Sequence, residues 1–491
     1  MENDLKSGTF GRGFWKMTDS KIIELFRAMT PRQLSRLGDF LRSPYFNKNT
    51  DCVLLYDYLQ KYAPDFSHPN IARQIVVQKL PTEKPLDDRN LAHLSSRLLA
   101  LVEKFLVAED LYADEGKQRL ALLQEYQARN LPKHYKSVQS DIEKQLEAAV
   151  VRDADYYQKS LVVKRLFYEH GDRNQRGFDE RLQAAADALD TYFVAEKLRF
   201  VCEMLNYETL LNIRYETNYW EEVLQWSAAT KYEKVTTIQV YRRLLLLLTE
   251  PDDTAHFKVA KSLVVASGQS FHRDELRQLY THLLNYCALR INRHNDQHFL
   301  NEHLEINKLM LSNGLIFDND LLPPWKYTNL VTVGLKTGQV EWTRQFIHEY
   351  QKRLPEEYRD NTFRYNLAQH HYYLKNYDEA QRALLQVEFT DVLLNVSARS
   401  LLIKIYCETE QTELLLSYLE ATRIFLLRNP LLDAHIKRQM QKFVEFTTKF
   451  AKIAPHDKMR YQTLAQLLPP AQEILHRDWL AGQFQKKLSG R

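Results

Sequence analysis

Three histidines lie close together in one segment and have the spacing of metal ligands. His294 and His298 are four residues apart, which places them on one face of a helix, and Glu302 and His303 follow. No H-E-x-x-H pattern accompanies them, and residues 292–297 are all polar. The segment is therefore predicted to be a solvated helix face that binds no metal, and the chain is predicted to need no cofactor.

Two short motifs look catalytic but lack the residues that would complete them. His272-Arg273-Asp274 matches the catalytic-loop triplet of protein kinases, yet Leu279 stands where that loop needs asparagine. The same triplet recurs at residues 476–478, which shows how easily it arises by chance. No Ser-His-Asp or Cys-His set can be singled out from the order of residues, so we predict that the chain is not an enzyme. A cluster of buried ionisable groups in the structure would favour an enzyme instead.

The overall composition narrows the classes of function and the cellular compartment. The chain has 67 Lys and Arg against 63 Asp and Glu, and this net charge of +4 is too small to indicate nucleic acid or a membrane surface. The four cysteines are far apart, which argues against a zinc site or a disulfide framework. The leucine run 244–248 is far shorter than the ~20 residues that span a bilayer. Residues 1–17 lack the apolar stretch of a signal peptide, so we expect a flexible tail and a cytoplasmic protein.

The elements that must position any site are predicted to be helices. Only 13 glycines occur in 491 residues, too few for the turns of an α/β nucleotide-binding fold. The predicted fold is all-α: an irregular α-solenoid of stacked antiparallel helix hairpins with an N-terminal helical domain. Its predicted parts are the tail 1–17, the N-terminal domain 18–115, a helical repeat array 116–430 and C-terminal capping helices 431–491.

The solenoid is predicted from a pattern that recurs after 34 residues. The first copy consists of Leu367, Ala368, Tyr377, Ala380, Leu384 and Val387. The second copy consists of Leu401, Leu402, Gln411, Leu414, Tyr418 and Ala421. One helix hairpin cannot bury its own apolar face, so such a period predicts stacked hairpins. Gly338 stands in the predicted turn of the preceding pair, where Lys375 and Thr409 stand in these two.

Residues 361–394 resemble a tetratricopeptide repeat at the positions of the first copy. Arg364, His371, Lys375 and Val392 depart from the family pattern. The whole chain, through segments such as "LRSPYFNKN" and "PPWKYTNLVTVGL", also resembles a group of uncharacterised Bacteroidetes proteins that carries no assigned activity. The resemblance to tetratricopeptide repeats implies a protein or peptide partner. It also implies which side chains would face the binding groove: Tyr365, Gln369, Tyr372, Arg399 and Tyr406.

The favoured function is therefore a non-enzymatic scaffold that binds a partner protein or peptide. An alternative rests on an amphipathic helix predicted over residues 433–453. Its basic face consists of Lys437, Arg438, Lys442, Lys449 and Lys452. This face either keeps the end of the array soluble, which we favour, or binds an acidic partner such as RNA or the ribosome.

Overall fold

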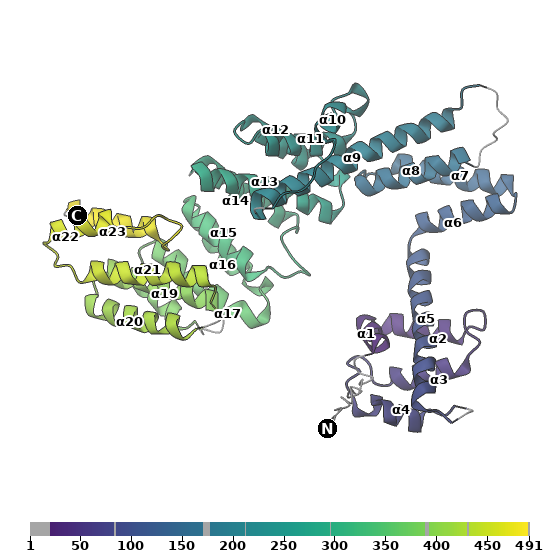
Figure 1. Ribbon diagram of the computed structural model, residues 1–491, viewed down its shortest axis with the longest axis horizontal. Helices are drawn as coiled ribbons and strands as arrows, with labels where there is room; N and C mark the ends of the chain where they lie inside the picture. Colours follow the sequence, from purple (N-terminus) through teal and green to yellow (C-terminus); the bar gives the residue numbers. More distant parts are fainter. Residues whose placement is uncertain are drawn as a thin grey trace, which may run out of the picture. The chain divides into compact units, whose positions relative to one another are not determined.

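The computed structural model describes residues 20–82, 85–169, 177–211, 213–294, 296–387, 392–429 and 432–489. The predicted tail 1–17 lies outside these residues. The described residues form twenty-three α-helices and no β-strand; Asp318 and Leu321 form a single isolated bridge. The predicted all-α class is confirmed (Figure 1). No helix among the described residues has the length and apolar character needed to cross a bilayer.

The chain divides into two compact units, residues 1–149 with 165–178 and residues 150–164 with 179–491. The predicted domain boundaries near 115 and 430 do not coincide with this division and stay predictions. Unit 1 contains α1 (Lys21–Ala28), α2 (Pro31–Arg42), α3 (Thr50–Gln60), the 3-10 helix η2 (Pro69–Ile71), α4 (Arg73–Lys79), α5 (Asp88–Ala113), α6 (Glu115–Ala128) and α7 (Pro132–Ala148). Helix α8 (Ala154–Glu169) belongs partly to each unit.

The helices of unit 2 follow one another to residue 489. They are α9 (Glu180–Leu211), α10 (Trp220–Trp226), η3 (Thr230–Tyr232), α11 (Thr236–Thr249), α12 (Ala255–Ala266), η4 (Gly268–Ser270), α13 (Arg273–His294), α14 (Gln297–Ser312), α15 (Pro324–Lys336), α16 (Val340–Glu349), η5 (Gln351–Arg353), α17 (Glu356–Tyr373), α18 (Tyr377–Leu385), α19 (Val392–Glu408), α20 (Thr412–Arg428), α21 (Ala434–Ala451), α22 (Lys458–Gln466) and α23 (Arg477–Ser489).

Short polar side chains set where several of these helices begin. Thr30 forms a capping box before α2: its hydroxyl accepts from the backbone N–H of Gln33, and the Gln33 side chain accepts from the backbone N–H of Thr30. Asp87 caps α5 and Asp433 caps α21 by simple side-chain capping, in which the carboxylate accepts from backbone N–H groups of the first turn. The helix starts are thus local properties of the sequence.

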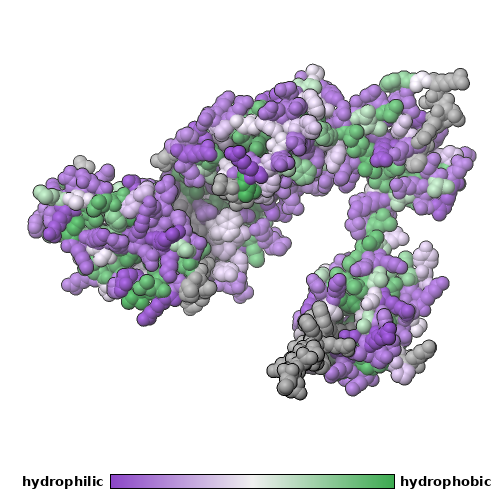
Figure 2. All heavy atoms as spheres, in the orientation of Figure 1, coloured by the Kyte–Doolittle hydropathy of each residue, from purple (hydrophilic) through white to green (hydrophobic). Residues whose placement is uncertain are grey.

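Consecutive helices of unit 2 pack in pairs, and the first members of neighbouring pairs also touch. Within pairs, α15 contacts α16, α17 contacts α18, and α19 contacts α20. Between pairs, α15 contacts α17 and α17 contacts α19. On the face shown in Figure 2, hydrophilic residues predominate and hydrophobic ones lie scattered among them.

The turns inside three successive pairs share one conformation. Gly338, Lys375 and Glu410 all have a left-handed backbone, with φ of 73°, 62° and 56°. After each of them, the next backbone N–H bonds to the carbonyl five residues earlier, as at Gln411 and Tyr406 (3.0 Å), which is the Schellman helix ending. The turn equivalent to Lys375 is therefore Glu410, not Thr409 as predicted.

This difference of one residue corrects the register of the predicted repeat. Lys375 and Glu410 are 35 residues apart, so Ala380 corresponds to Leu415 and not to Leu414. Ala380 and Leu415 are buried at 0% and 3% exposure, whereas Leu414 is 43% exposed. The apolar pattern had allowed the wrong choice because residues 414–416 are all leucine.

Candidate functional site

One carboxylate of unit 2 accepts hydrogen bonds from three helices. Glu408, the last residue of α19, accepts from the hydroxyls of Tyr372 in α17 (2.5 Å) and Tyr377 in α18 (2.7 Å). It also accepts from the indole N–H of Trp479 (2.5 Å) and the side-chain amide of Gln483 (3.3 Å), both in α23. Both oxygens of this half-buried carboxylate are therefore engaged.

A second polar contact lies one turn earlier on α19 and joins this helix to the residue just before α23. Lys404 lies four residues before Glu408 on α19, and its Nζ is 3.0 Å from Nδ1 of His476. The Lys404 ammonium also lies 5.9 Å from the centre of the Trp479 ring. The Glu408 cluster is the set Tyr372, Tyr377, Lys404, Glu408, His476, Trp479 and Gln483.

Burial shifts the ionisation of the two bases in this cluster. Burial lowers the pKa of Lys404 to about 8; Glu408 opposes this shift and Lys336 adds to it. Burial, together with the nearby cations Lys404 and Lys336, lowers the pKa of His476 to about 3. The imidazole is consequently neutral at pH 7, and its Nδ1 accepts from the Lys404 ammonium.

The pKa of the Glu408 carboxyl is lowered, which keeps the group ionised. Burial alone would raise its pKa, but hydrogen bonds from Tyr372, Trp479 and Tyr377 outweigh burial, and the pKa lies below its ordinary value. Burial and the bond to this carboxylate raise the pKa of Tyr377 to about 12. The arrangement is thus an anionic acceptor surrounded by neutral donors, which suits recognition of N–H and O–H groups.

His476 has a left-handed backbone conformation, and its ring contacts both α19 and α21. His476 comes directly before α23, and its carbonyl accepts from the N–H of Leu480 (3.1 Å), the first hydrogen bond of that helix. Its φ of 54° lies in the left-handed region that residues other than glycine rarely adopt. The His476 ring packs edge-on against Phe443 of α21, with centroids 5.1 Å apart.

Of the five predicted groove residues, only Tyr372 belongs to the cluster. Tyr365 and Tyr406 are 9% and 3% exposed, so they pack inside unit 2 and do not line an accessible surface as expected. Gln369 accepts from the hydroxyl of Thr332 in α15 (3.2 Å). Arg399 donates to Asn395 (2.7 Å) and stacks on Phe425 at 4.5 Å, within the α19–α20 hairpin.

The corrected register explains why prediction missed Lys404. A spacing of 34 residues pairs Tyr372 with Tyr406, which is buried, whereas a spacing of 35 pairs Gln369 with Lys404. The position of Lys404 could therefore have been found from the repeat. Nothing local marks Glu408, because its donors Trp479 and Gln483 lie more than 70 residues away along the chain.

The predicted basic helix corresponds to α21. Its apolar side is buried as expected, with Met440 and Phe443 at 0% exposure. On its basic face, Lys442 forms an ion pair with Glu473, and Lys449 forms one with Glu445 (2.5 Å). Arg438 and Lys452 are exposed. At least two of the five predicted cations are thus neutralised within the chain.

The predicted histidine segment spans the end of α13 and the start of α14. His294 and His298 are exposed, and His303 contacts the side chain of Asn307 (3.2 Å). In the described part of the chain, three possible metal ligands meet instead at Glu250, Asp253 and His256. The His256 ring lies 2.8 Å from the Glu250 carboxylate, and both carboxylates are more than half exposed, so a surface hydrogen bond accounts for this group.

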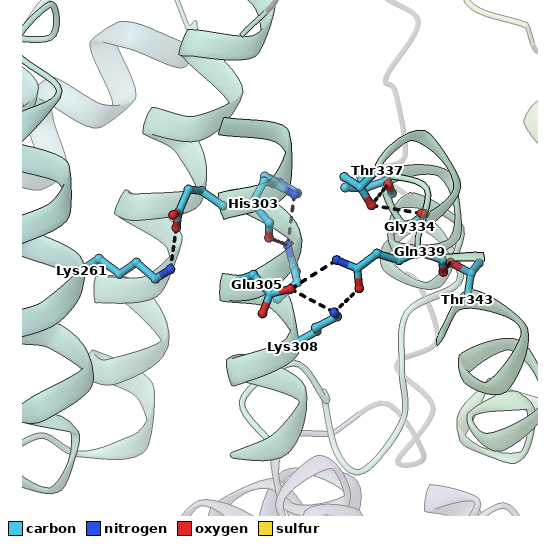
Figure 3. A network of polar contacts seen from close by, with 11 residues as sticks. Lys261, His303, Glu305, Lys308, Gly334, Thr337, Gln339 and Thr343 are labelled. Atoms are coloured by element: carbon cyan, nitrogen blue, oxygen red, sulfur yellow. Dashed lines mark hydrogen bonds and ion pairs between the residues drawn. The ribbon is translucent and has the colours of Figure 1, made fainter. Parts of the chain in front are cut away.

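A polar network connects α12, α14 and the turn before α16 (Figure 3). Lys261 pairs with Glu302 (2.5 Å) beside a cavity of about 950 Å³ between α12 and α14. Lys308 bridges Glu305 (2.9 Å) and the side chain of Gln339. Since these contacts join successive helix pairs, their role is to fix the packing of one pair on the next.

Comparison of the chain with protein-family models, with curated proteins and with solved structures finds no match.

Proposed function

We propose that this chain is a non-enzymatic interaction scaffold, an irregular, tetratricopeptide-like α-solenoid that binds a helical segment of a partner protein. Contacts from α15 to α17 and from α17 to α19 support the stacking of hairpins. The shared turns at Gly338, Lys375 and Glu410 support a repeated unit. Stacked hairpins offer a continuous inner face on which a partner segment can lie.

The observation that carries this proposal is the placement of α23 on α19. Four side-chain donors converge on Glu408, and two of them come from one helix that meets α19 through side chains. Polar anchors of this kind, with aromatic and basic side chains, recur where one protein recognises a helix of another. The surface formed by α17 and α19 therefore has the chemistry of a helix-binding site.

The Glu408 cluster also bears on the alternative of an enzyme. A lysine with a pKa of about 8 beside a neutral histidine has the ionisation of a catalytic base or nucleophile. Recognition is favoured over catalysis because the carboxylate is engaged by four donors of the chain itself and the Lys404 ammonium donates to His476.

Site-specific photo-crosslinking in the native cells tests the scaffold. A photoreactive amino acid replaces Tyr373, an exposed residue of α17, and in a control chain it replaces Trp226, an exposed residue of α10. We expect a protein adduct at position 373 that survives nuclease treatment and does not form at position 226. Without such an adduct the scaffold is not supported. A nuclease-sensitive adduct from a probe at Lys452 would favour the RNA alternative.

A further inference from the structure

Helix α23 carries two adjacent rows of side chains, each with a spacing of four residues. Trp479 and Gln483 form a donor row that faces Glu408. Leu480 and Phe484 form an apolar row with 0% and 1% exposure. The Phe484 ring packs edge-on against Phe450 of α21, with centroids 5.1 Å apart. An amphipathic helix with one apolar row and one polar row is the form in which helices are recognised by other proteins.

A hydrogen bond at one end and an ion pair at the other set the direction in which α23 lies on α19. At the start of α23, His476 meets Lys404 (3.0 Å). Near its end, Lys487 forms an ion pair with Glu410 (2.8 Å). The contacts thus run in order along the end of α19 and into the turn after it, from residue 404 through 408 to 410. A helix bound in the opposite direction would place its basic residue beside Lys404, which disfavours it.

The connection to α23 is not helical and includes two prolines. Residues 467–476 join α22 to α23, and Pro469 and Pro470 lie within them. The connection is held on α21, where Lys442 forms an ion pair with Glu473. A release of α23 would therefore begin at its C-terminal end, and it would leave the direct packing between α17 and α19 in place.

We propose that α23 is an internal competitor for the partner's helix. The surface of α17, α19 and α21 takes an amphipathic helix with N–H donors at positions i and i+4, large apolar residues at i+1 and i+5, and a basic residue at i+8. Helix α23 has this pattern from Trp479 to Lys487 and occupies the surface until a partner helix with the same pattern displaces it. This inference rests on the proposed scaffold function and names the class of its partner.

A labelled synthetic peptide with the sequence of residues 475–489 tests the competition in the full chain. Trp479→Phe keeps the ring in α23 but removes its N–H donor to Glu408, which weakens the internal helix and not the added peptide. Loss of a hydrogen bond to a charged group corresponds to about tenfold in an equilibrium constant. We expect the variant chain to bind the peptide about tenfold more tightly than the wild-type chain, measured by fluorescence anisotropy.

Two further variants identify Glu408 as the acceptor. Glu408→Gln added to Trp479→Phe should reduce peptide binding again by about tenfold, because the added peptide then loses its charged acceptor. Glu413→Gln, at an exposed position of α20, should change nothing. Equal peptide affinities of the wild-type and Trp479→Phe chains, with unchanged circular dichroism, would overturn the inference.

Hydrogen exchange on the wild-type chain gives a measurement that does not depend on a variant's folding. Amides of α23 should exchange at least tenfold faster than those of α19, because the surface opens without unfolding. Equal protection of α19 and α23 would show that α23 is not released on its own and would overturn the inference. A native-cell adduct at position 373 would then still support the scaffold, so the two failures are distinguishable.

Discussion

At the scale of single residues, Glu408 is a partly buried acceptor shared by several helices of unit 2. A carboxylate taken out of water is costly unless donors replace the lost water, and here four side chains do so. Two of the donors, Trp479 and Gln483, hold α23 in place. The residue is thus a stabilising centre of unit 2, and in the proposed scaffold it is the point at which a partner helix would be recognised.

Removing the carboxylate should destabilise unit 2. Glu408→Ala leaves the Tyr372, Tyr377 and Trp479 donors without their acceptor, and we expect a loss of about 3 kcal/mol in the free energy of unfolding. Urea denaturation followed by circular dichroism measures the loss. The matched change Glu413→Ala, at an exposed position of α20, should stay within about 0.5 kcal/mol. Equal effects of the two substitutions would contradict the role assigned to Glu408.

The pH dependence of α23 follows from His476. Its pKa of about 3 lies below the ordinary value of 6.5, so the folded state takes up fewer protons and stability is lost as pH falls below 6.5. Lys404, with a pKa of about 8, is protonated in both the folded and the unfolded state below that value, so it affects stability only at higher pH. Glu408 has a lowered pKa, so the stability that its carboxylate contributes is lost as pH falls from the ordinary pKa of 4.5 through the lower pKa of the folded state. Between pH 7 and pH 5.5, α23 should lose on the order of 1 kcal/mol of protection against hydrogen exchange.

His476→Asn is the control for this pH effect. Asparagine tolerates the left-handed backbone at this position and supplies an acceptor oxygen, but it does not titrate. The variant should keep α23 in place and show a flat profile between pH 7 and pH 5.5. A profile unchanged from that of the wild-type chain would assign the pH effect to another group.

At the scale of elements, the turn after α17 stores a small backbone strain. Lys375 adopts a φ of 62°, which is unfavourable for a residue with a Cβ and suits glycine. Lys375→Gly should raise the free energy of unfolding by about 0.5–1 kcal/mol. Lys375→Ala keeps the Cβ and should give no such gain. Thermal denaturation distinguishes the two variants, and an equal response would argue against strain at this turn.

The contact between α17 and α18 depends on a small residue. Ala380 has 0% exposure, and a carboxylate there would be buried within the hydrophobic cluster that includes Ala368 and Leu384. Ala380→Asp should therefore cost more than about 3 kcal/mol in unit 2. Glu379→Asp changes the exposed neighbouring residue and should be nearly neutral. An unchanged melting temperature of Ala380→Asp would contradict the assigned register.

At the scale of the whole molecule, the division into two compact units predicts separate unfolding. Phe26 lies in a cluster confined to unit 1, and Phe346 lies in a cluster confined to unit 2. Phe26→Ala and Phe346→Ala should each cost about 3–5 kcal/mol. Differential scanning calorimetry should resolve two transitions, of which each substitution shifts a different one. A single transition that both substitutions lower alike would show that the units unfold together.

The sequence by itself determined the helices and much of their pairing. Their apolar residues recur at intervals of three and four residues. Caps such as Thr30 and Asp433 act within one helical turn. The two copies of the predicted repeat fall on the hairpins α17–α18 and α19–α20, and the helix predicted over residues 433–453 corresponds to α21. These features depend on neighbours along the chain, so one sequence is enough to predict them.

Only the tertiary structure decided the register of the second hairpin and the composition of the site. The run of leucines at 414–416 satisfies either register, and the choice depends on which leucine packs against α19 and on the turn at Glu410. Glu408 and His476 look unremarkable in the sequence because the contacts between α19 and the start of α23 join residues about 70 positions apart. Their ionisation depends on burial and on charges from other helices, neither of which is a local property of the chain.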